Sequence, residues 1–425
     1  MTGALRRILT GVAITLAAAV AVVGVVGDAP VARADQVRDL EYWLNDYGFS
    51  QAWNTTRGGG VTVAVIDTGV DGSITELTGA VVGGTDVSGV GSSNGQTPVG
   101  DDNAHGTLVA SLLAGRGTPA GGGLIGVAPE ASILAVSVAF GTSDAVLSND
   151  DQIAAGIRWA VDNGADVINM SLTRNTLDWP TSWDDAFLYA FEHDVVVVAA
   201  AGNRGSGTTE VGAPATIPGV LTVAGVDQSK EASFDASSQG ITIAVAAPSE
   251  KLVGVAPGGG YMEWYGTSAA APIVSGLVAL VRSAYPKLDA AEVINRVIET
   301  ANPNGHTVPS PIYGNGLIDA AAAVSAYVPK STSATPTDLL QEWIRVHRRA
   351  DAAPLTPTTP SSAAPVVPDA DPPLPQQNAA AGWLPTPLTL TYVSVPLALL
   401  VGFGILVTLF GIGATRHFKR IRSKL

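Results

Sequence analysis

Short apolar runs alternate with longer helical patterns between Val61 and about Tyr327. Runs that are β-branched, nearly continuous and of strand length are typical of strands buried on both faces of a parallel sheet. They cover residues 61–66, 133–138, 167–170, 195–200 and 220–224. Helical periodicity fits residues 148–163, 181–193, 267–284 and 289–301. Ser148 or Asn149 can cap the first of these helices, and Asp289 the last. The alternation predicts one α/β domain over residues 61–330, with helices on both faces of a mostly parallel sheet and no internal repeat.

The N-terminus has the pattern of a secretory signal peptide. Arg6 and Arg7 precede a charge-free apolar run at residues 8–26, and Ala32-Arg33-Ala34 places small residues at the two positions that a signal peptidase reads. We therefore predict a signal peptide over residues 1–34, with an uncleaved N-terminal anchor as the alternative. Both interpretations place the following part of the chain outside the cytoplasm.

The C-terminal part predicts a membrane anchor behind a spacer. Residues 352–391 contain ten prolines among Ala, Thr and Ser, a composition that forms a stiff, extended linker. Residues 392–415 are free of charge and long enough to cross a bilayer as a helix. The five Lys and Arg residues of the tail at 416–425 place that tail in the cytoplasm. A cell-wall sorting signal is the alternative, but residues 384–388 (L-P-T-P-L) lack the Thr and Gly of an L-P-x-T-G site. We expect a single-pass anchor in the cell membrane, with the catalytic part of the chain extracytoplasmic.

Two shorter segments flank the predicted domain. Residues 35–60 form a short N-terminal extension, and an independently folding inhibitory domain needs about 50 residues. We therefore expect that activation does not depend on the removal of such a domain. Residues 331–351 contain a possible helix whose apolar face carries Leu340, Trp343, Ile344 and His347. Packing of this face on its own domain is favoured over a surface kept for a partner.

Composition narrows the classes of protein that remain. Hydrophobic residues make up 46% of the chain and charged residues 14%, against about 25% charged residues in ordinary soluble domains. Such a chain can bury a large core, which excludes a wholly disordered protein. The net charge of −14 lacks the basic footprint of a nucleic-acid binder. Because the sequence has no cysteine, disulfides, thiolate zinc sites and a cysteine nucleophile are excluded.

Three short motifs place reactive groups at the ends of predicted elements. Asp67 ends the first strand at its carboxyl edge, where open α/β sheets place their sites. His105 opens a short helical pattern after a loop rich in Gly, Asn and Asp. Ser268 follows a predicted strand at residues 261–265 and falls in the first turn of the long apolar helix, near unpaired N–H groups. Together they supply an orienting carboxylate, a base and a hydroxyl nucleophile.

A fourth motif supplies a hydrogen-bond donor for developing negative charge. Asn203 follows Gly202 in a turn after the strand at residues 195–200. Acyl transfer places negative charge on the carbonyl oxygen of the substrate, and a fixed amide N–H group stabilises that charge. The four motifs together therefore predict hydrolysis of an acyl bond.

The chain resembles the subtilisin-type serine proteases, or subtilases, through four motifs in that family's order: D-T-G at Asp67, H-G-T at His105, A-G-N ending at Asn203, and G-T-S-x-A-x-P around Ser268. Residues 313–320 also resemble the family's closing segment. A signal peptide, a catalytic domain, a Pro-rich linker, one membrane helix and a basic tail are the layout of the mycosins, the membrane-anchored subtilases of type VII secretion systems. Trp43-Leu44-Asn45 and Ala52-Trp53 are similar to mycosin N-termini as well.

The resemblance implies a fold and a mechanism. The fold would be a subtilisin-like three-layer α/β domain with a mostly parallel sheet, plus one C-terminal transmembrane helix. The activity would be that of a serine endopeptidase with no cofactor and no metal. Ser268 would attack the peptide carbonyl, His105 would take its proton, and Asp67 would hold the imidazole in the useful tautomer. Asn203 and the backbone N–H of Ser268 would form the oxyanion hole.

The resemblance also implies where a substrate binds. Ser171, Leu172 and Thr173 match the segment that pairs with extended substrate, and Gly202 would contribute to the same site. Many subtilases have Gly at the place of Thr173, so Thr173 would narrow the main specificity pocket. The implied partners are a protein or peptide substrate, the membrane and the membrane components of a type VII secretion system, with no nucleic acid.

Two departures leave the branch of the family open. Mycosins often carry disulfides, and the residue before their catalytic His is usually Gly, where this chain has Ala104.

Asp101 and Asp102 are interpreted as a solvated pair, with cation binding as the alternative. His193, His306 and His417 are expected to have no catalytic role.

Two functional hypotheses remain: an active endoprotease facing the cell exterior, or a structural component of a secretion complex with proteolysis secondary or absent.

Overall fold

The computed structural model describes residues 34–141, 144–207 and 209–348. The predicted Pro-rich linker, membrane helix and basic tail lie outside these residues, as do residues 1–33 of the predicted signal peptide. The fold described below is that of the part between these ends.

Seven parallel strands form one sheet in the order β2-β3-β1-β4-β5-β6-β7. Their bounds are β1 Thr62–Asp67, β2 Val81–Asp86, β3 Ser132–Ser137, β4 Val167–Met170, β5 Val196–Ala200, β6 Leu221–Val226 and β7 Ile243–Pro248. The five runs predicted from the sequence are β1, β3, β4, β5 and β6. All of these strands are almost wholly buried, because helices cover both faces of the sheet. The predicted α/β class with a mostly parallel sheet is therefore confirmed.

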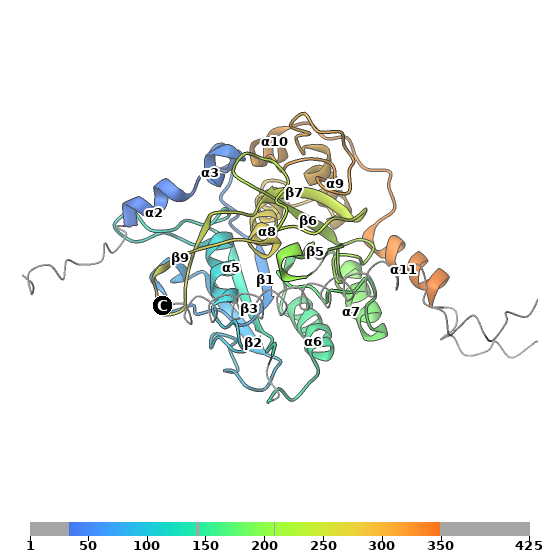
Figure 1. Ribbon diagram of the computed structural model, residues 1–425, viewed down its shortest axis with the longest axis horizontal. Coiled ribbons are helices and arrows are strands. Elements are labelled where there is room, and N and C mark those ends of the chain that lie inside the picture. The colour runs from blue at the N-terminus through green and yellow to red at the C-terminus, as the bar shows by residue number, and fades with distance from the viewer. Residues whose placement is uncertain (1–33, 142–143, 208, 349–425) are drawn as a thin grey trace, which may run out of the picture. The chain divides into compact units, whose positions relative to one another are not determined.

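Helices form a layer on each face of this sheet (Figure 1). On one face, α5 (His105–Ala114) and α8 (Thr267–Ala284) pack on each other and on the central strands. On the other face, α6 (Asn149–Asp162) packs beside α7 (Thr181–Glu192). The Ser148 side chain caps α6, as predicted, by accepting a hydrogen bond from the N–H of Asp151. Asp289 caps α9 (Ala290–Glu299) in a capping box with Glu292.

Among the described residues, α8 is the one helix long and apolar enough to cross a membrane. It is mostly buried inside the domain, where it contacts the sheet, so its apolar character belongs to the core. The membrane helix predicted at residues 392–415 lies outside the described residues.

A two-stranded antiparallel hairpin stands apart from the main sheet. It pairs β8 (Leu252–Val255) with β9 (Tyr261–Trp264), and β9 leads directly into α8. The strand predicted at residues 261–265 is therefore present, but its only strand partner in the described structure is β8.

The N-terminal extension is packed into the domain. Its helices are α2 (Ala34–Leu40), α3 (Trp43–Asp46) and α4 (Phe49–Ala52). Trp43 and Phe49 are fully buried, and the indole N–H of Trp53 donates to the carbonyl of Val127 at 2.9 Å. At the other end of the chain, α10 (Ala320–Ser325) contacts α4. The extension thus contributes to the core of the described domain.

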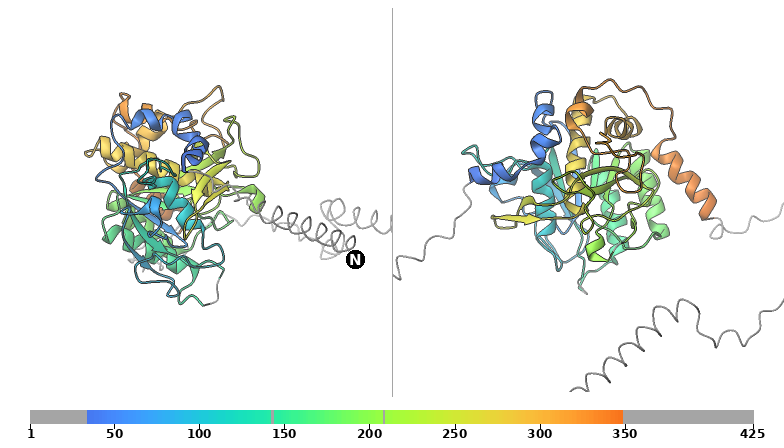
Figure 2. Two further views of the ribbon diagram at one scale, coloured as in Figure 1. Left: turned by 90° about the vertical axis from the view of Figure 1, so that its left-hand side faces the viewer. Right: turned by 45° about the horizontal axis from the view of Figure 1, so that its top comes forward.

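Helix α11 (Pro336–His347) is the last described element, and it lies on the side of the domain away from α2 (Figures 1 and 2). Leu340 is fully buried, and the ring of Trp343 lies 4.2 Å from that of Trp179. Arg348 donates to Asp184 of α7 at 2.8 Å. The predicted apolar face therefore packs against its own domain.

Candidate active site

The carboxylate of Asp67 and the imidazole of His105 are already hydrogen-bonded. Asp67 lies at the carboxyl end of β1 and is 2% exposed. Its Oδ1 lies 2.8 Å from His105 Nδ1, and its Oδ2 lies 3.0 Å from the same nitrogen. Oδ1 also accepts the backbone N–H of Thr68 at 2.7 Å. Because a carboxylate accepts hydrogen bonds, Nδ1 carries the proton, and Nε2 of the neutral ring is left as the basic nitrogen.

Close contact between α5 and β1 brings these two side chains together. Any Cβ at position 106 would collide with the carbonyl of Gly69, so glycine is required directly after His105. The N–H of Gly106 donates to the hydroxyl of Thr68 at 3.0 Å. Thr107 accepts the N–H of Asp71, also at 3.0 Å. The H-G-T motif is therefore explained by the packing of α5 on β1.

Opposing effects act on the basicity of His105. Burial would lower the pKa of this imidazole, because it disfavours the charged form. The charge of Asp67, its hydrogen bond and the more distant charge of Asp102 outweigh burial and raise the pKa above its ordinary value of 6.5. A raised pKa means that the ring loses its capacity as a base as the pH falls through that value.

Ser268 lies in the first turn of α8, as predicted from the sequence. Its hydroxyl donates to the carbonyl of Ser171 at 3.1 Å, and the hydroxyl of Ser171 donates to the carbonyl of Ser268 at 2.8 Å. The hydrogen bonds of the described residues include none from the Ser268 hydroxyl to His105. Both residues nevertheless line the same cleft. In proteins without bound substrate, catalytic hydrogen bonds are often long or unformed.

The side-chain amide of Asn203 is hydrogen-bonded to the start of α8 through its oxygen and not through its nitrogen. Its Oδ1 accepts both the N–H and the hydroxyl of Thr267, each at 2.8 Å. A backbone N–H can only donate, which fixes Oδ1 on this side and leaves Nδ2 available to another acceptor. The N–H of Gly202 donates to the same Thr267 hydroxyl at 3.1 Å. The turn after β5 is thereby tied to the start of α8.

A cleft of about 400 Å³ contains most of the predicted site. Its walls are formed by Asp67, Thr68, Asp101, Asp102, His105, Phe140, Gly141, Ser171, Leu172, Thr173 and Ser268. A second hollow of about 410 Å³ shares Phe140, Leu172 and Thr173 with it and extends the groove to Arg174. Gly202 and Asn203 do not line the cleft and instead contact Thr267. Thr173 faces Gly212 so closely that any side chain at position 212 would collide with its hydroxyl.

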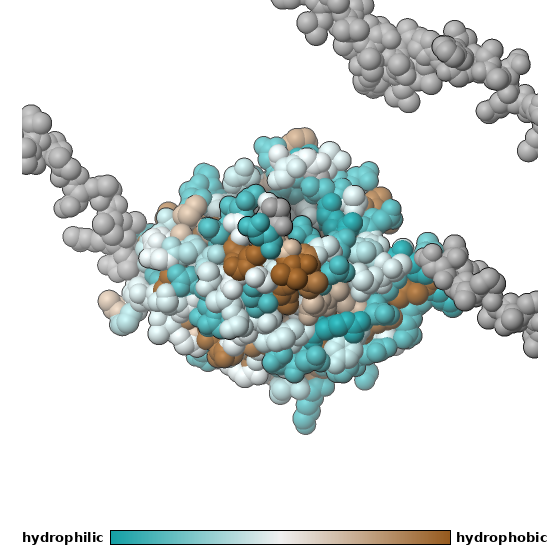
Figure 3. All heavy atoms as spheres, turned by 90° about the horizontal axis from the view of Figure 1, so that it is seen from below, coloured by the Kyte–Doolittle hydropathy of each residue, from teal (hydrophilic) through white to brown (hydrophobic). Residues whose placement is uncertain are grey.

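Apolar side chains are exposed on the loops that follow β2 and β3. They are Val90, Val146 and Leu147, and the N–H of Val146 donates to the carbonyl of Ser88. Seen from below, the domain shows brown apolar patches set in a largely hydrophilic surface (Figure 3).

Sequence reasoning missed several residues of this site. Asp101 and Asp102 are both exposed, in agreement with a solvated pair, but the sequence did not predict that they line the cleft. Phe140 carried no recognisable signal. Thr267 is part of the G-T-S-x-A-x-P motif, but its hydrogen bonds to Asn203 were not predicted. Among the described residues, no group of three or more His, Asp or Glu side chains could hold a metal ion.

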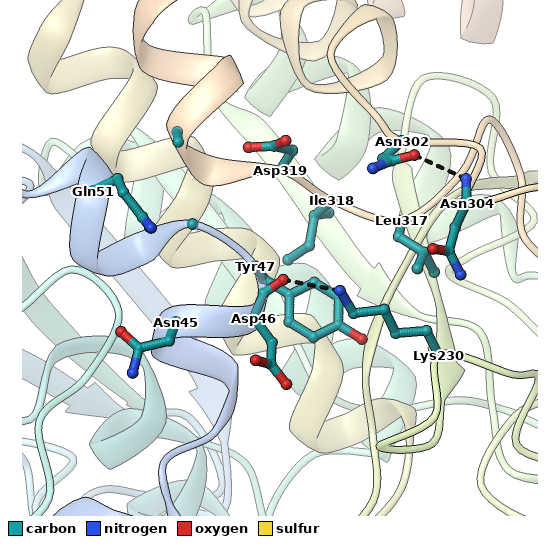
Figure 4. Close-up of a pocket in the computed structure, with 12 residues that line it drawn as sticks. Asn45, Asp46, Tyr47, Gln51, Lys230, Asn302, Asn304, Leu317, Ile318 and Asp319 are labelled. Carbon is teal, nitrogen blue, oxygen red and sulfur yellow. Dashed lines mark hydrogen bonds between the residues drawn. The ribbon is translucent and has the colours of Figure 1, made fainter.

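A separate polar cavity of about 310 Å³ lies between α3, α4 and the segment before α10 (Figure 4). Lys230 donates to the carbonyl of Asp46 there at 3.1 Å, and its ammonium lies 5.2 Å from the ring centroid of Tyr47. None of the predicted site residues lines this cavity. This cavity lies where the N-terminal extension meets residues 302–321.

Comparison with known proteins places this fold and cleft in one family. The subtilase family model matches residues 58–316. Subtilisin DY from Bacillus licheniformis is 37% identical, over 69% of this chain and 96% of its own length. The crystal structure of MycP1 from Mycobacterium smegmatis has a TM-score of 0.58 and 31% identity, and the match covers 69% of this chain and 86% of that one. The MycP3 protease from the type VII (ESX-3) secretion system has a TM-score of 0.57 and 32% identity, with 67% and 88% covered. The chain belongs to the subtilase family.

Proposed function

We propose that this chain is a membrane-anchored, extracytoplasmic serine endopeptidase of the mycosin type, with Asp67, His105 and Ser268 as its catalytic triad. The observation that carries the proposal is the Asp67–His105 hydrogen bond of 2.8 Å beside a cleft that Ser268 also lines. An orienting carboxylate, a base and a hydroxyl at one cleft are the groups that acyl transfer requires.

In the proposed mechanism, rotation of the Ser268 side chain moves its hydroxyl from the Ser171 carbonyl to Nε2 of His105. The hydroxyl oxygen then attacks the peptide carbonyl as its proton passes to Nε2. Asp67 stays ionised, accepts the hydrogen bond from Nδ1–H and stabilises the imidazolium. Asn203 Nδ2 and the N–H of Ser268 donate to the oxyanion.

The second half of the reaction follows the same groups. The C–N bond breaks as the imidazolium of His105 gives its proton to the leaving amine. Water, activated by the neutral ring, then hydrolyses the ester on Ser268. Extended substrate would lie along Ser171, Leu172 and Thr173, which all line the main cleft; Leu172 and Thr173 also line the second hollow. Gly202 supports this site through Thr267.

The proposed location rests on the ends of the chain. A signal peptide at residues 1–34, a linker at 352–391, a single membrane helix at 392–415 and a cytoplasmic tail at 416–425 would tether the catalytic domain outside the cell membrane. The likeness to MycP1 and MycP3 supports action on proteins exported by a type VII secretion system. The natural substrates would then be proteins that leave the cell beside the enzyme.

A fluorophosphonate probe tests the activity directly. It forms a covalent bond with an activated serine, so we expect labelling of the full chain and none of Ser268→Ala. No labelling of the native chain would overturn the proposed hydrolase.

The alternative is a structural part of the secretion complex with proteolysis secondary or absent, which the predicted tether and spacer favour. Ser268→Ala at native expression separates the two hypotheses. Loss of substrate processing in that variant supports a role as a protease, whereas normal processing contradicts it.

A further inference from the structure

Trp264 contacts the imidazole of His105, whose Nδ1 is hydrogen-bonded to Asp67. Its ring centroid lies 5.6 Å from that of His105, and the two planes are at 85°, an edge-to-face contact. Trp264 does not line the main cleft. It lines a neighbouring hollow of about 290 Å³ together with Asp235, Glu250 and Tyr265. The indole therefore contacts His105 and also lines that hollow.

The hairpin packs the indole tightly against α5. Gly254 stands on the partner strand, where a Cβ would lie 3.1 Å from Trp264 Nε1 and 2.8 Å from a methyl group of Leu108. Leu108 is one turn after His105 on α5. The indole N–H is buried and has no hydrogen-bond partner among the described residues. The position of Trp264 is thus set by ring packing and not by its N–H group.

Three contacts fix the hairpin that carries Trp264. The N–H of Gly258 donates to Asp71 Oδ2 at 2.8 Å, and the hydroxyl of Tyr261 donates to the buried carboxylate of Glu76 at 2.5 Å. Just before β8, the carbonyl of Glu250 accepts the hydroxyl of Tyr42 at 2.8 Å. The N-terminal extension and the segment after β1 therefore both hold the strand on which Trp264 lies.

We infer that Trp264 is a positioning residue for His105: it fixes the plane of the imidazole and keeps water from one side of the ring. This inference rests on the proposed role of His105 as the base. Asp67 holds the Nδ1 end of the ring but leaves rotation about that hydrogen bond possible. The perpendicular indole removes this freedom, so Nε2 stays turned to the cleft that Ser268 lines.

The test compares three variants of the full chain. Trp264→Leu fills much of the volume without an aromatic ring, and Trp264→Phe keeps a ring. Met262→Ala removes an exposed side chain of the same strand and serves as the control. We measure the rate of fluorophosphonate labelling and the kcat and KM for a chromogenic peptide between pH 5 and 9, with thermal unfolding as the check on folding.

Trp264→Leu is expected to lower the labelling rate and kcat about tenfold with KM nearly unchanged. Its acid limb should move to higher pH, because water admitted beside the ring stabilises the imidazolium. Trp264→Phe should restore most of the rate, and Met262→Ala should match the native chain. A native rate and pH profile in Trp264→Leu overturns the inference, as does an equal loss in Trp264→Phe.

A readout without catalysis separates this inference from the proposed function. The chain has five histidines, so selective isotope labelling allows the His105 resonance to be assigned by its loss in His105→Ala and titrated by NMR. A higher His105 pKa in Trp264→Leu than in the native chain supports the inference even if no labelling occurs, whereas an unchanged pKa overturns it. Absence of probe labelling in the native chain overturns only the proposed hydrolase.

Discussion

The two halves of the candidate active site differ in how far they are assembled without substrate. In the base half, Asp67 and His105 are hydrogen-bonded at 2.8 Å, and the close approach of α5 to β1 fixes both. In the nucleophile half, the hydroxyl of Ser268 is hydrogen-bonded to Ser171. Asn203 is held through its oxygen by Thr267, with Nδ2 still available to an acceptor.

This difference has a physical cause. The base half is built from a buried strand end and a packed helix, so its geometry follows from the core. In the nucleophile half, a single rotation about the Cα–Cβ bond of Ser268 decides which acceptor its hydroxyl reaches, at the cost of one hydrogen bond of about 1 kcal/mol. Substrate can therefore complete the nucleophile half, while the base half is preorganised.

The largest effect should come from removing the nucleophile. Ser268→Ala is expected to lower kcat by roughly 10⁴- to 10⁶-fold, as loss of a triad residue does in subtilisin. The melting temperature should change little, because the hydroxyl contributes one partly exposed hydrogen bond. Peptide hydrolysis and thermal unfolding are measured on the same samples. Residual activity within tenfold of the native chain would place the nucleophile elsewhere.

Loss of the oxyanion donor should have the next largest effect. Asn203→Ala is expected to lower kcat by roughly 10²- to 10³-fold, with KM nearly constant, because the amide binds charge that develops only in the transition state. Steady-state kinetics on a peptide ester measures both constants. A rise in KM with kcat unchanged would mean that Asn203 binds substrate and does not stabilise the oxyanion.

Loss of the Thr267 hydroxyl, which links the turn at Asn203 to the start of α8, should have a smaller effect. Thr267→Val removes the hydroxyl that bonds Asn203 and Gly202 but keeps the backbone bond, so kcat should fall about three- to tenfold. Thr222→Val is a matched control, since Thr222 also uses a buried hydroxyl, bonded to Ala215 and remote from the cleft. Equal losses in the two variants would show that the effect is one of stability alone.

The smallest expected effect comes from removing the charge of Asp102, which acts on the pKa of His105. The raised pKa of His105 means that activity is lost as the pH falls through that pKa, since the protonated ring cannot accept the serine proton. Asp102 contributes to the increase, so Asp102→Asn should lower the pKa and move the acid limb of kcat/KM to lower pH. The exposed Asp39→Asn serves as the control. An acid limb that moves upward, or not at all, would contradict the charge effect.

The sequence predicted the five inner strands of the main sheet. Strands β1, β3, β4, β5 and β6 have continuous β-branched runs because helices cover both faces of the sheet. Edge strand β2 was missed, since it contains Gly83 and Gly84 and is only partly buried. The opposite edge strand, β7, was also missed, because its Ala-rich run has few β-branched residues.

The structure places the predicted Asp67, His105 and Ser268 at one cleft, but the sequence did not predict how their side chains are oriented. Asp67, His105 and Ser268 could be placed because each lies at an element end with a recognisable motif. The bond from Ser268 to Ser171 depends on a rotamer, and the contact of Trp264 with His105 depends on the packing of a hairpin outside the main sheet. Neither follows from periodicity or spacing.

Mass-spectrometric mapping of the fluorophosphonate adduct tests most directly whether the two halves act as one site. The account predicts that the adduct of the native chain lies on Ser268, and that labelling is lost in His105→Ala although the serine is intact. An adduct on another residue, or labelling of Ser268 at the native rate in His105→Ala, would contradict it.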